Sequence, residues 1–271
     1  MQNNIEQRYF INSVARGFKL LEKIAEAGEP LTLSQTAEAM EMTLPTAYRF
    51  LYTLQAIGMI EKEPDRKAYR IAPRVLKLGH GVFKSSQLWN TAHPCLLRAR
   101  QEYDETFNLA ILESDQILYI DRVKTQAILT INLEIGSKLP AYCTSMGRVL
   151  LAWLPIEEAR RRLRLNRREK HTQNTVTETK RLEAILLKVR RQGFAINQGE
   201  LAPELVSAAA PIFNRDGEVV AALNMAVNAA RHDKDYPYAV MAPAVVKYAR
   251  RISSAMGFLR PAAESAGNGK P

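Results

Sequence analysis

The stretch LTLSQTAEAMEMTLPTAYRFLYTLQAIG, residues 31–58, contains the clearest structural signal of the chain. Thr32 or Ser34 can cap a first helix, because a hydroxyl at this position accepts a hydrogen bond from a free backbone N–H. Thr43 can cap a second helix, which ends at Gly58. Two helices separated by so short a turn predict a helix-turn-helix unit.

The flanking segments complete a winged version of this unit. Residues 12–27 predict an amphipathic helix with apolar residues at three- and four-residue steps. Its expected core-facing stripe is Val14, Phe18, Leu21 and Ala25. After the second helix, MIEKE and AYRIA are short strand-like runs around the turn PDRK. We therefore predict a winged helix-turn-helix domain over residues 10–72.

The second helix of this unit has two faces. Ala47, Leu51 and Leu54 lie at core spacing. The other face is polar and aromatic with an early arginine, which is typical of a helix that enters the major groove of DNA. The same residues could also be the solvated side of an ordinary three-helix unit. The candidate DNA-binding residues, including two at the tip of the hairpin, are Thr43, Pro45, Thr46, Tyr48, Arg49, Tyr52, Thr53, Arg66 and Lys67.

The rest of the chain predicts a linker and an α/β domain, so the whole is of the α+β class. Residues 73–89 predict a linker helix with a joint at Gly79 and Gly81, and a longer helix follows over about 90–105. The domain over 90–260 contains six strand-like runs, FNLAILES, QILYIDRV, AILTINLE, GFAIN, LVSAAAPIF and EVVAALNMAV. A last helix is expected over 236–258, and the tail 261–271 is expected to be disordered.

Composition narrows the function classes. The net charge of +10 favours an anionic partner, although the basic residues are spread along the chain rather than gathered in its first part. Two cysteines, no apolar run of membrane-spanning length and no signal sequence favour a cytoplasmic protein without a membrane partner. No nucleotide-binding, nucleophile or metal motif occurs, so we expect no enzyme activity, no cofactor and no metal.

Several motifs in the same order resemble the IclR family of bacterial transcription regulators over residues 10–260. They are SVARGFKLLE, LTLSQTAEAMEM, LPTAYRFLYTL, GMIEKEPDRKAYRIAPRVLKLG, LPAYCTSMGRVLLA and GFAINQGELAPELVSAAAPIF. The resemblance implies a GAF-like effector-binding domain, homodimers or dimers of dimers, and double-stranded operator DNA as partner. LPAYCTSMGRVLLA further resembles the branch that controls aromatic-acid catabolism around protocatechuate and 4-hydroxybenzoate.

The resemblance also implies an effector pocket in the carboxyl-terminal domain. Its residues in this chain would be Ile128, Leu139, Thr144, Ser145, Met146, Asn197, Leu205, Ser207, Asn224 and Ala226. A helix that begins at Thr144 and Ser145 suits a carboxylate, because its first N–H groups and its dipole favour negative charge. The same two residues could only cap that helix, and Asn224 would face outward if the strand register differs by one residue. Cys143, beside this helix start, is either a reactive thiol or a small buried residue.

Other functions stay open at this level. The effector could be an aliphatic keto- or dicarboxylic acid rather than an aromatic one. An enzyme acting on the bound metabolite is a remote alternative. So is a protein- or RNA-binding module that uses the arginine-rich run 160–168, which we interpret as a solvated helix face because Glu157, Glu158 and Glu169 flank it.

Overall fold

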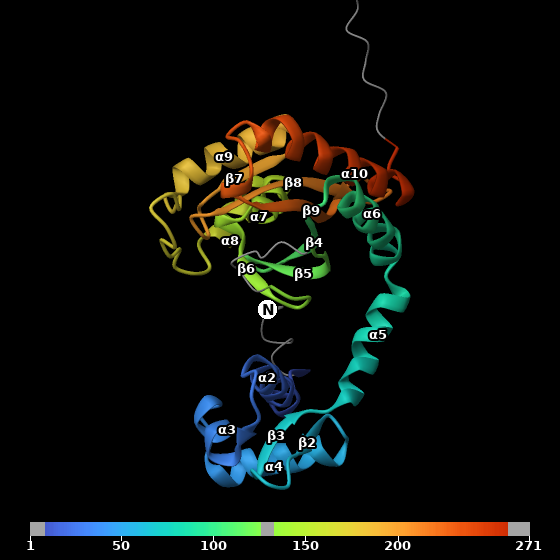
Figure 1. Ribbon diagram of the computed structural model, residues 1–271. Helices are drawn as coiled ribbons and strands as arrows, with labels where there is room; N and C mark the ends of the chain where they lie inside the picture. Colours follow the sequence, from blue (N-terminus) through green and yellow to red (C-terminus); the bar gives the residue numbers. More distant parts are fainter. Residues whose placement is uncertain (1–8, 126–132, 260–271) are drawn as a thin grey trace, which may run out of the picture. The chain divides into compact units, whose positions relative to one another are not determined.

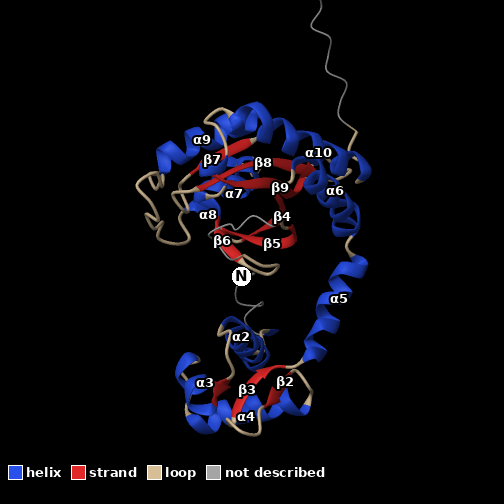
Figure 2. Cartoon of the chain, in the orientation of Figure 1, coloured by secondary structure: helices blue, strands red, loops and turns tan. Residues whose placement is uncertain are grey.

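The computed structural model describes residues 9–125 and 133–259, and the chain forms two compact units. The first unit ends at Ser85 and the second begins at Ser86. Each unit contains both helices and strands (Figure 1; Figure 2), which confirms the predicted α+β class. Of the helices that lie in the described ranges, none has the length and apolar character needed to cross a bilayer.

The amino-terminal unit is a winged helix-turn-helix. A three-stranded sheet of order β1-β3-β2 packs with three helices, and all its strand pairs are antiparallel. Thr32 caps α3 through a capping box with Gln35, as the sequence suggested. Thr43 is the N-cap residue of α4, but its side chain makes no capping hydrogen bond. The elements are α2 (Asn12–Glu26), β1 (Leu31–Thr32), α3 (Leu33–Ala39), α4 (Leu44–Ala56), β2 (Ile60–Lys62) and β3 (Ala68–Ile71).

Of the apolar stripe predicted for α2, only Leu21 packs, partly buried, against the core of this unit. Leu20 and Ile24 are the buried residues of the helix, and they pack with Leu51 of α4. Val14 and Phe18, expected in the core, are 52% and 58% exposed. The prediction was wrong because α2 has two apolar stripes at helical spacing, and periodicity does not say which of them meets the sheet.

The linker also differs from expectation. After a short 3-10 turn, Pro73–Val75, helix α5 runs unbroken over Leu76–Ser85, so the joint expected at Gly79 and Gly81 is absent. The break lies at Ser86, whose hydroxyl accepts a hydrogen bond from Trp89 N and caps the next helix, α6 (Gln87–Tyr103). Glycine costs a helix only about 1 kcal/mol, which neighbouring residues offset here, whereas a good N-cap begins a new helix.

The carboxyl-terminal unit is built on one antiparallel sheet of order β6-β5-β4-β9-β8-β7. The central hairpin turns at Asn214–Gly217, as its sequence predicted. The expected strand AILTINLE falls largely on residues outside the described ranges, as does the tail. The strands are β4 (Thr106–Glu113), β5 (Gln116–Val123), β6 (Lys138–Pro140), β7 (Ala195–Gln198), β8 (Leu205–Phe213) and β9 (Val219–Asn228).

Helices cover both faces of this sheet (Figure 2), so the unit has three layers and two cores. Helices α6 and α10 pack on one face, and α7 packs on the other with α8 and α9 against it. A π-helical turn, Pro237–Met241, precedes the last helix. The helices of the second face and the last helix are α7 (Ser145–Ala152), α8 (Ile156–Leu163), α9 (Thr179–Gln192) and α10 (Ala242–Ala255).

Candidate functional site

The first candidate site is the outer face of α4 and the tip of the β2–β3 hairpin. Ala47, Leu51 and Leu54 are buried, as predicted, and the opposite side of the helix is left in solvent. Tyr48 and Tyr52 are exposed on successive turns, with ring centroids 6.3 Å apart. Two aromatic rings beside polar side chains form a surface that can contact both base edges and sugars.

Three cations accompany this surface. Arg49 is exposed on α4, and Arg66 and Lys67 are exposed in the turn between β2 and β3. Within the described residues, none of the three forms an ion pair, whereas the neighbouring Arg70 pairs with Glu61 at 3.0 Å. Unpaired cations at the surface are available to phosphate oxygens. The other candidates are exposed too, except the half-buried Thr46, whose hydroxyl lies 2.9 Å from that of Thr43.

The second candidate site is a pocket in the carboxyl-terminal unit, on the face of the sheet that packs against α7. Strand register places its polar residues side by side. Asn108 of β4 pairs with Asn224 of β9, and Ser207 of β8 pairs with Asn197 of β7. The Asn108 amide donates to Asn224 Oδ1 at 2.7 Å. Asn224 therefore faces the pocket, and the outward register considered from sequence does not occur.

A β-bulge adds two further residues to this pocket. Strict alternation would put Tyr119 and Arg122 of β5 on opposite faces, because they are three residues apart. The register of β5 against β4 shifts between Leu109 and Ala110, so that Arg122 pairs with Asn108 and Tyr119 pairs with Ala110. Both side chains consequently line the same pocket.

Two buried polar atoms in this pocket have no partner among the described residues. Arg122 Nε and Asn108 Oδ1 are inaccessible to solvent and make no hydrogen bond in the described structure. An unsatisfied buried donor or acceptor costs about 1–3 kcal/mol, so such atoms are rare away from ligand sites. Burial also lowers the pKa of the Arg122 guanidinium, and the negative charge of the nearby Glu134 partly offsets this effect.

The start of α7 forms the opposite wall. Thr144 caps the helix by accepting a hydrogen bond from Gly147 N at 3.2 Å. The Ser145 and Ser207 hydroxyls lie 2.8 Å apart and join α7 to β8. A Cβ on Gly147 would lie 2.3 Å from the backbone of Ala141, so only glycine lets the 3-10 turn η2 (Ala141–Cys143) approach the helix this closely.

A buried ion pair supports this wall from beneath. Arg148 of α7 and Glu200 have side chains only 4% and 9% exposed, and they form a bidentate pair at 2.6 and 2.7 Å. Glu200 also accepts a hydrogen bond from the Asn197 amide at 3.2 Å, and Arg148 Nε donates to the Tyr142 carbonyl. The pair thus fixes the orientation of a pocket amide and of the turn η2.

The cavity between these side chains is small, about 30 Å³, which is space for about two water molecules. Burial raises the pKa of Tyr119, so its phenol keeps its proton. Burial likewise raises the pKa of the Cys143 thiol to about 12. Of the two interpretations of Cys143, the structure supports the small buried residue, since the thiolate is the reactive form.

The structure brings together eight of the ten residues that the resemblance implied. Met146 is fully buried in the core under α7 and does not line the pocket, because the helix turns it away from Ser145. Ile128 lies outside the described residues. The pocket residues that we expected and find there are Leu139, Thr144, Ser145, Asn197, Leu205, Ser207, Asn224 and Ala226. Those that sequence reasoning missed, besides the neighbouring Cys143, are Asn108, Tyr119, Arg122, Leu133 and Leu201.

Strand β5 also connects the pocket to α6 on the other face of the sheet. Asp121, next to Arg122, is buried and accepts a hydrogen bond from Arg122 N at 2.8 Å. Its other oxygen lies 2.8 Å from His93 Nδ1 of α6. The His93 ring stacks on Trp89 with centroids 4.8 Å apart. The Asp121 carboxylate thus joins the backbone of Arg122 in β5 to His93 in α6, the helix that follows the linker.

Comparisons with known proteins agree over most of the chain. The family described as "Bacterial transcriptional regulator IclR C-terminal" matches residues 80–254, and the "IclR helix-turn-helix domain" matches residues 13–64. The Pca regulon regulatory protein of Pseudomonas putida is 36% identical over 82% of this chain and 76% of its own length.

Solved structures show the same architecture. A transcriptional regulator from Rhodococcus sp. RHA1 is 34% identical, with a TM-score of 0.80 over 91% of this chain and 98% of that one. An IclR homologue from Microbacterium hydrocarbonoxydans, complexed with 4-hydroxybenzoate, has the same fold at 22% identity, with a TM-score of 0.78 over 90% and 98% of the two chains. The chain therefore belongs to the IclR family of bacterial transcriptional regulators.

Proposed function

We propose that this transcriptional regulator binds an aromatic carboxylic acid in the pocket between its sheet and α7, and that the acid changes how its winged domain binds operator DNA. The observation that carries the proposal is Arg122, a partly buried guanidinium whose Nε has no partner and which lines a pocket with no carboxylate among its described lining residues. A carboxylate is the partner that satisfies both its charge and its fork of donors.

The other pocket residues suit a hydroxylated ring. Leu133, Leu139 and Leu201 supply apolar walls. The Ser145–Ser207 hydroxyl pair and the Asn108–Asn224 amide pair supply directional donors and acceptors for a phenolic hydroxyl. Similarity to the Pca regulon regulatory protein and to a homologue complexed with 4-hydroxybenzoate supports an aromatic acid as the effector.

The pocket is too small for the acid, so binding requires a change in the conformation of the pocket. An engineered cavity of roughly 150 Å³ holds a benzene ring, several times the space between these side chains. The acid must therefore bind a more open arrangement, and its binding free energy shifts the population toward that arrangement. We infer that the shift reaches α6 through Arg122, Asp121 and His93, whose contacts are on opposite faces of β5.

DNA binding is assigned to the exposed face of α4 and to the hairpin tip. The helix-turn-helix match supports this assignment, as do the unpaired cations Arg49, Arg66 and Lys67. The side chains of α4 would contact base edges in the major groove, and the hairpin cations would contact phosphates or the minor groove.

We further propose that the amino-terminal unit dimerises through its exposed apolar groove. Val14 and Phe18 of α2 line this groove together with Phe50, Ile57 and Leu78. Except for the half-buried Phe50, these side chains are exposed, and so much apolar surface in one groove is costly for an isolated domain. A second copy of the same unit would cover them and present two recognition helices to a palindromic site.

The test begins with selection of bound sequences from a random duplex library. Affinity for the selected duplex is then measured by fluorescence anisotropy with 4-hydroxybenzoate, benzoate, pyruvate and succinate. We expect the aromatic acids to change DNA affinity by about 5- to 150-fold, the usual range of coupling between sites. A response to pyruvate or succinate alone would replace the aromatic effector by an aliphatic one. If none of the acids changes DNA affinity, the proposed coupling is wrong.

A further inference from the structure

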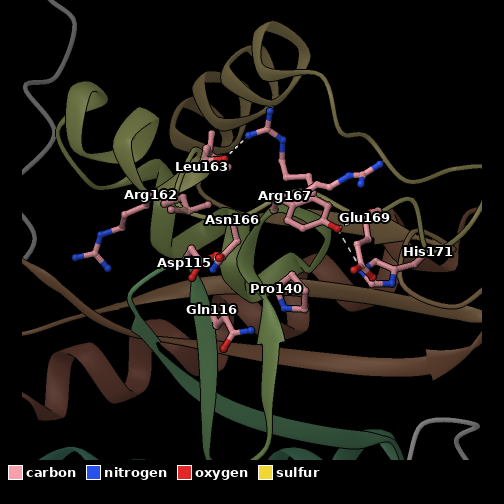
Figure 3. Close-up of a pocket in the computed structure, with 12 residues that line it drawn as sticks. Asp115, Gln116, Pro140, Arg162, Leu163, Asn166, Arg167, Glu169 and His171 are labelled. Carbon is pink, nitrogen blue, oxygen red and sulfur yellow. Dashed lines mark hydrogen bonds between the residues drawn. The ribbon is translucent and has the colours of Figure 1, made fainter. Parts of the chain in front are cut away.

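A second, larger cavity lies on the other side of the turn η2. It has a volume of about 460 Å³, within the usual size range of small-molecule sites. Figure 3 shows Asp115 and Asn166 close together on one side, and Glu169 and His171 on the other. Arg167 lies between the two groups. This cavity, which we call the basic cavity, shares no lining residue with the effector pocket.

Of the three arginines that line the basic cavity, Arg162 pairs with Glu158, and the other two form no ion pair with a carboxylate of the described residues. Arg168 donates to Thr177 O, to Leu163 O and to Thr179 Oγ1, all of them uncharged acceptors. Arg167 is exposed and forms no ion pair within the described part of the chain. Arginines earlier in the same segment behave differently, since Arg160 and Arg161 are paired with Glu183 and Glu158. The interpretation of the run 160–168 as a solvated helix face with paired charges therefore applies to the arginines of α8, but not to Arg167 and Arg168 beyond its end.

The remaining lining groups include apolar side chains and an aromatic ring, which suit the carbon skeleton of an organic ligand. Pro140, Leu151 and Leu163 are apolar. The Tyr142 hydroxyl donates to the Glu169 carbonyl at 2.5 Å and lies 3.2 Å from His171 Nε2, so the phenol ring is held in place. Asp115 accepts from the Asn166 amide at 2.8 Å and, like the Glu169 carboxylate, forms no ion pair in the described residues.

We propose that the basic cavity is a second binding site, for a small organic dianion. Two lining arginines without an ion-pair partner among the described residues fit two carboxylates, and the apolar wall with the Tyr142 ring fits a carbon skeleton. The carboxylates of Asp115 and Glu169 also line the cavity, and their repulsion disfavours an anion of higher charge. The site lies beside the effector pocket, because Pro140 and Tyr142 line one cavity while Leu139 and Cys143 line the other.

The experiment uses the full chain labelled with 15N-arginine and follows the arginine Nε–H signals by NMR at constant ionic strength. The probes are succinate, phthalate and inorganic phosphate, with chloride as the reference anion. We expect succinate or phthalate to shift the Arg167 and Arg168 signals saturably. Arg167→Gln should weaken this binding about tenfold, the loss expected for one charge-assisted hydrogen bond. Arg164→Gln, an exposed arginine outside the cavity, should leave it unchanged.

A second control separates the two cavities. Arg122→Gln should leave the titration of Arg167 and Arg168 unaltered, because Arg122 lines only the effector pocket. Signals that move linearly with every anion, without saturation, would show a nonspecific basic surface and overturn the proposal. Saturable binding of phosphate that is tighter than binding of both organic probes would overturn the organic assignment.

Discussion

The two candidate recognition sites of this protein differ in the solvent exposure of their charged side chains. On the winged domain Arg49, Arg66 and Lys67 are exposed, and water solvates them until DNA arrives. In the effector pocket Arg122 Nε is inaccessible to solvent and has no partner among the described residues, and the amides and hydroxyls around it are already hydrogen-bonded. Salt screens the exposed charges strongly and the partly buried charge of Arg122 much less. DNA affinity should therefore depend strongly on salt concentration, whereas effector affinity should depend on which polar groups the ligand carries.

The largest expected effect tests whether the pocket is held by buried charge. Arg148→Ala should reduce the free energy of unfolding of the carboxyl-terminal unit by about 3–5 kcal/mol, because it leaves the Glu200 carboxylate buried and unpaired. Urea unfolding followed by circular dichroism measures this loss. The matched control is Arg161→Ala, which removes an exposed ion pair with Glu158 and should cost below about 1 kcal/mol. Equal losses for the two variants would contradict the described burial.

Salt should separate the two sites. If Arg49, Arg66 and Lys67 of one winged domain each neutralise a phosphate, DNA affinity should fall about fortyfold between 50 and 200 mM salt, and further for a dimer. Effector affinity should change by less than about twofold, because the guanidinium and the carboxylate meet away from solvent. Anisotropy and calorimetric titrations across this range measure both. An effector affinity that falls as steeply as DNA affinity would place the acid at the surface.

A single substitution on α4 should affect only DNA. Arg49→Ala should weaken binding to the selected duplex by about 1–3 kcal/mol, or about 5- to 150-fold, through the loss of a base or phosphate contact. Thermal shift by 4-hydroxybenzoate should be the same as in the unsubstituted protein. Gln55→Ala, at an exposed position of α4 outside the candidate set, serves as the control. Unchanged DNA affinity in the Arg49 variant would mean that the recognition face is assigned wrongly.

The smallest expected effect is an absence of reaction at Cys143. Burial raises the pKa of its thiol to about 12, above the usual value, so the thiolate fraction stays low up to about pH 10 and rises only as pH approaches the raised value. Ellman's reagent at pH 8 should label neither Cys143 nor Cys95, both buried, until urea unfolds the protein. Rapid labelling of Cys143 in the folded protein would show that the pocket opens often without effector.

These sites also differ in how far the sequence predicts them. The winged domain follows from local rules: caps at Thr32, a proline in the first turn of α4, and a hairpin turn. Two predictions in the amino-terminal unit failed because the sequence allowed two outcomes. Either apolar stripe of α2 could have faced the core, and the glycines of α5 could have broken the helix or not. No local rule decides which stripe a partner element will cover.

The effector pocket depends on contacts far apart in the chain. The family resemblance placed Asn224 and Ser207 correctly on the strands that form it. It did not indicate Arg122, because the bulge opposite Leu109 and Ala110 breaks the alternation on which strand faces are predicted. The sequence did not indicate Asn108 either, because its partner in the pocket, Asn224, is 116 residues away in the chain. A basic residue near the end of a strand otherwise looks like an ordinary surface position.

The central claim is that Arg122 binds the carboxylate of the effector, and a chemical double-mutant cycle tests it most directly. Calorimetry would compare 4-hydroxybenzoate with its neutral amide, 4-hydroxybenzamide, on the unsubstituted protein and on Arg122→Gln. We predict that the unsubstituted protein prefers the acid by about 2 kcal/mol, near thirtyfold, as for other charge-assisted hydrogen bonds. In Arg122→Gln this preference should disappear, while the amide binds both proteins alike. Equal affinity of the unsubstituted protein for acid and amide, or a preference that survives the substitution, would contradict the account.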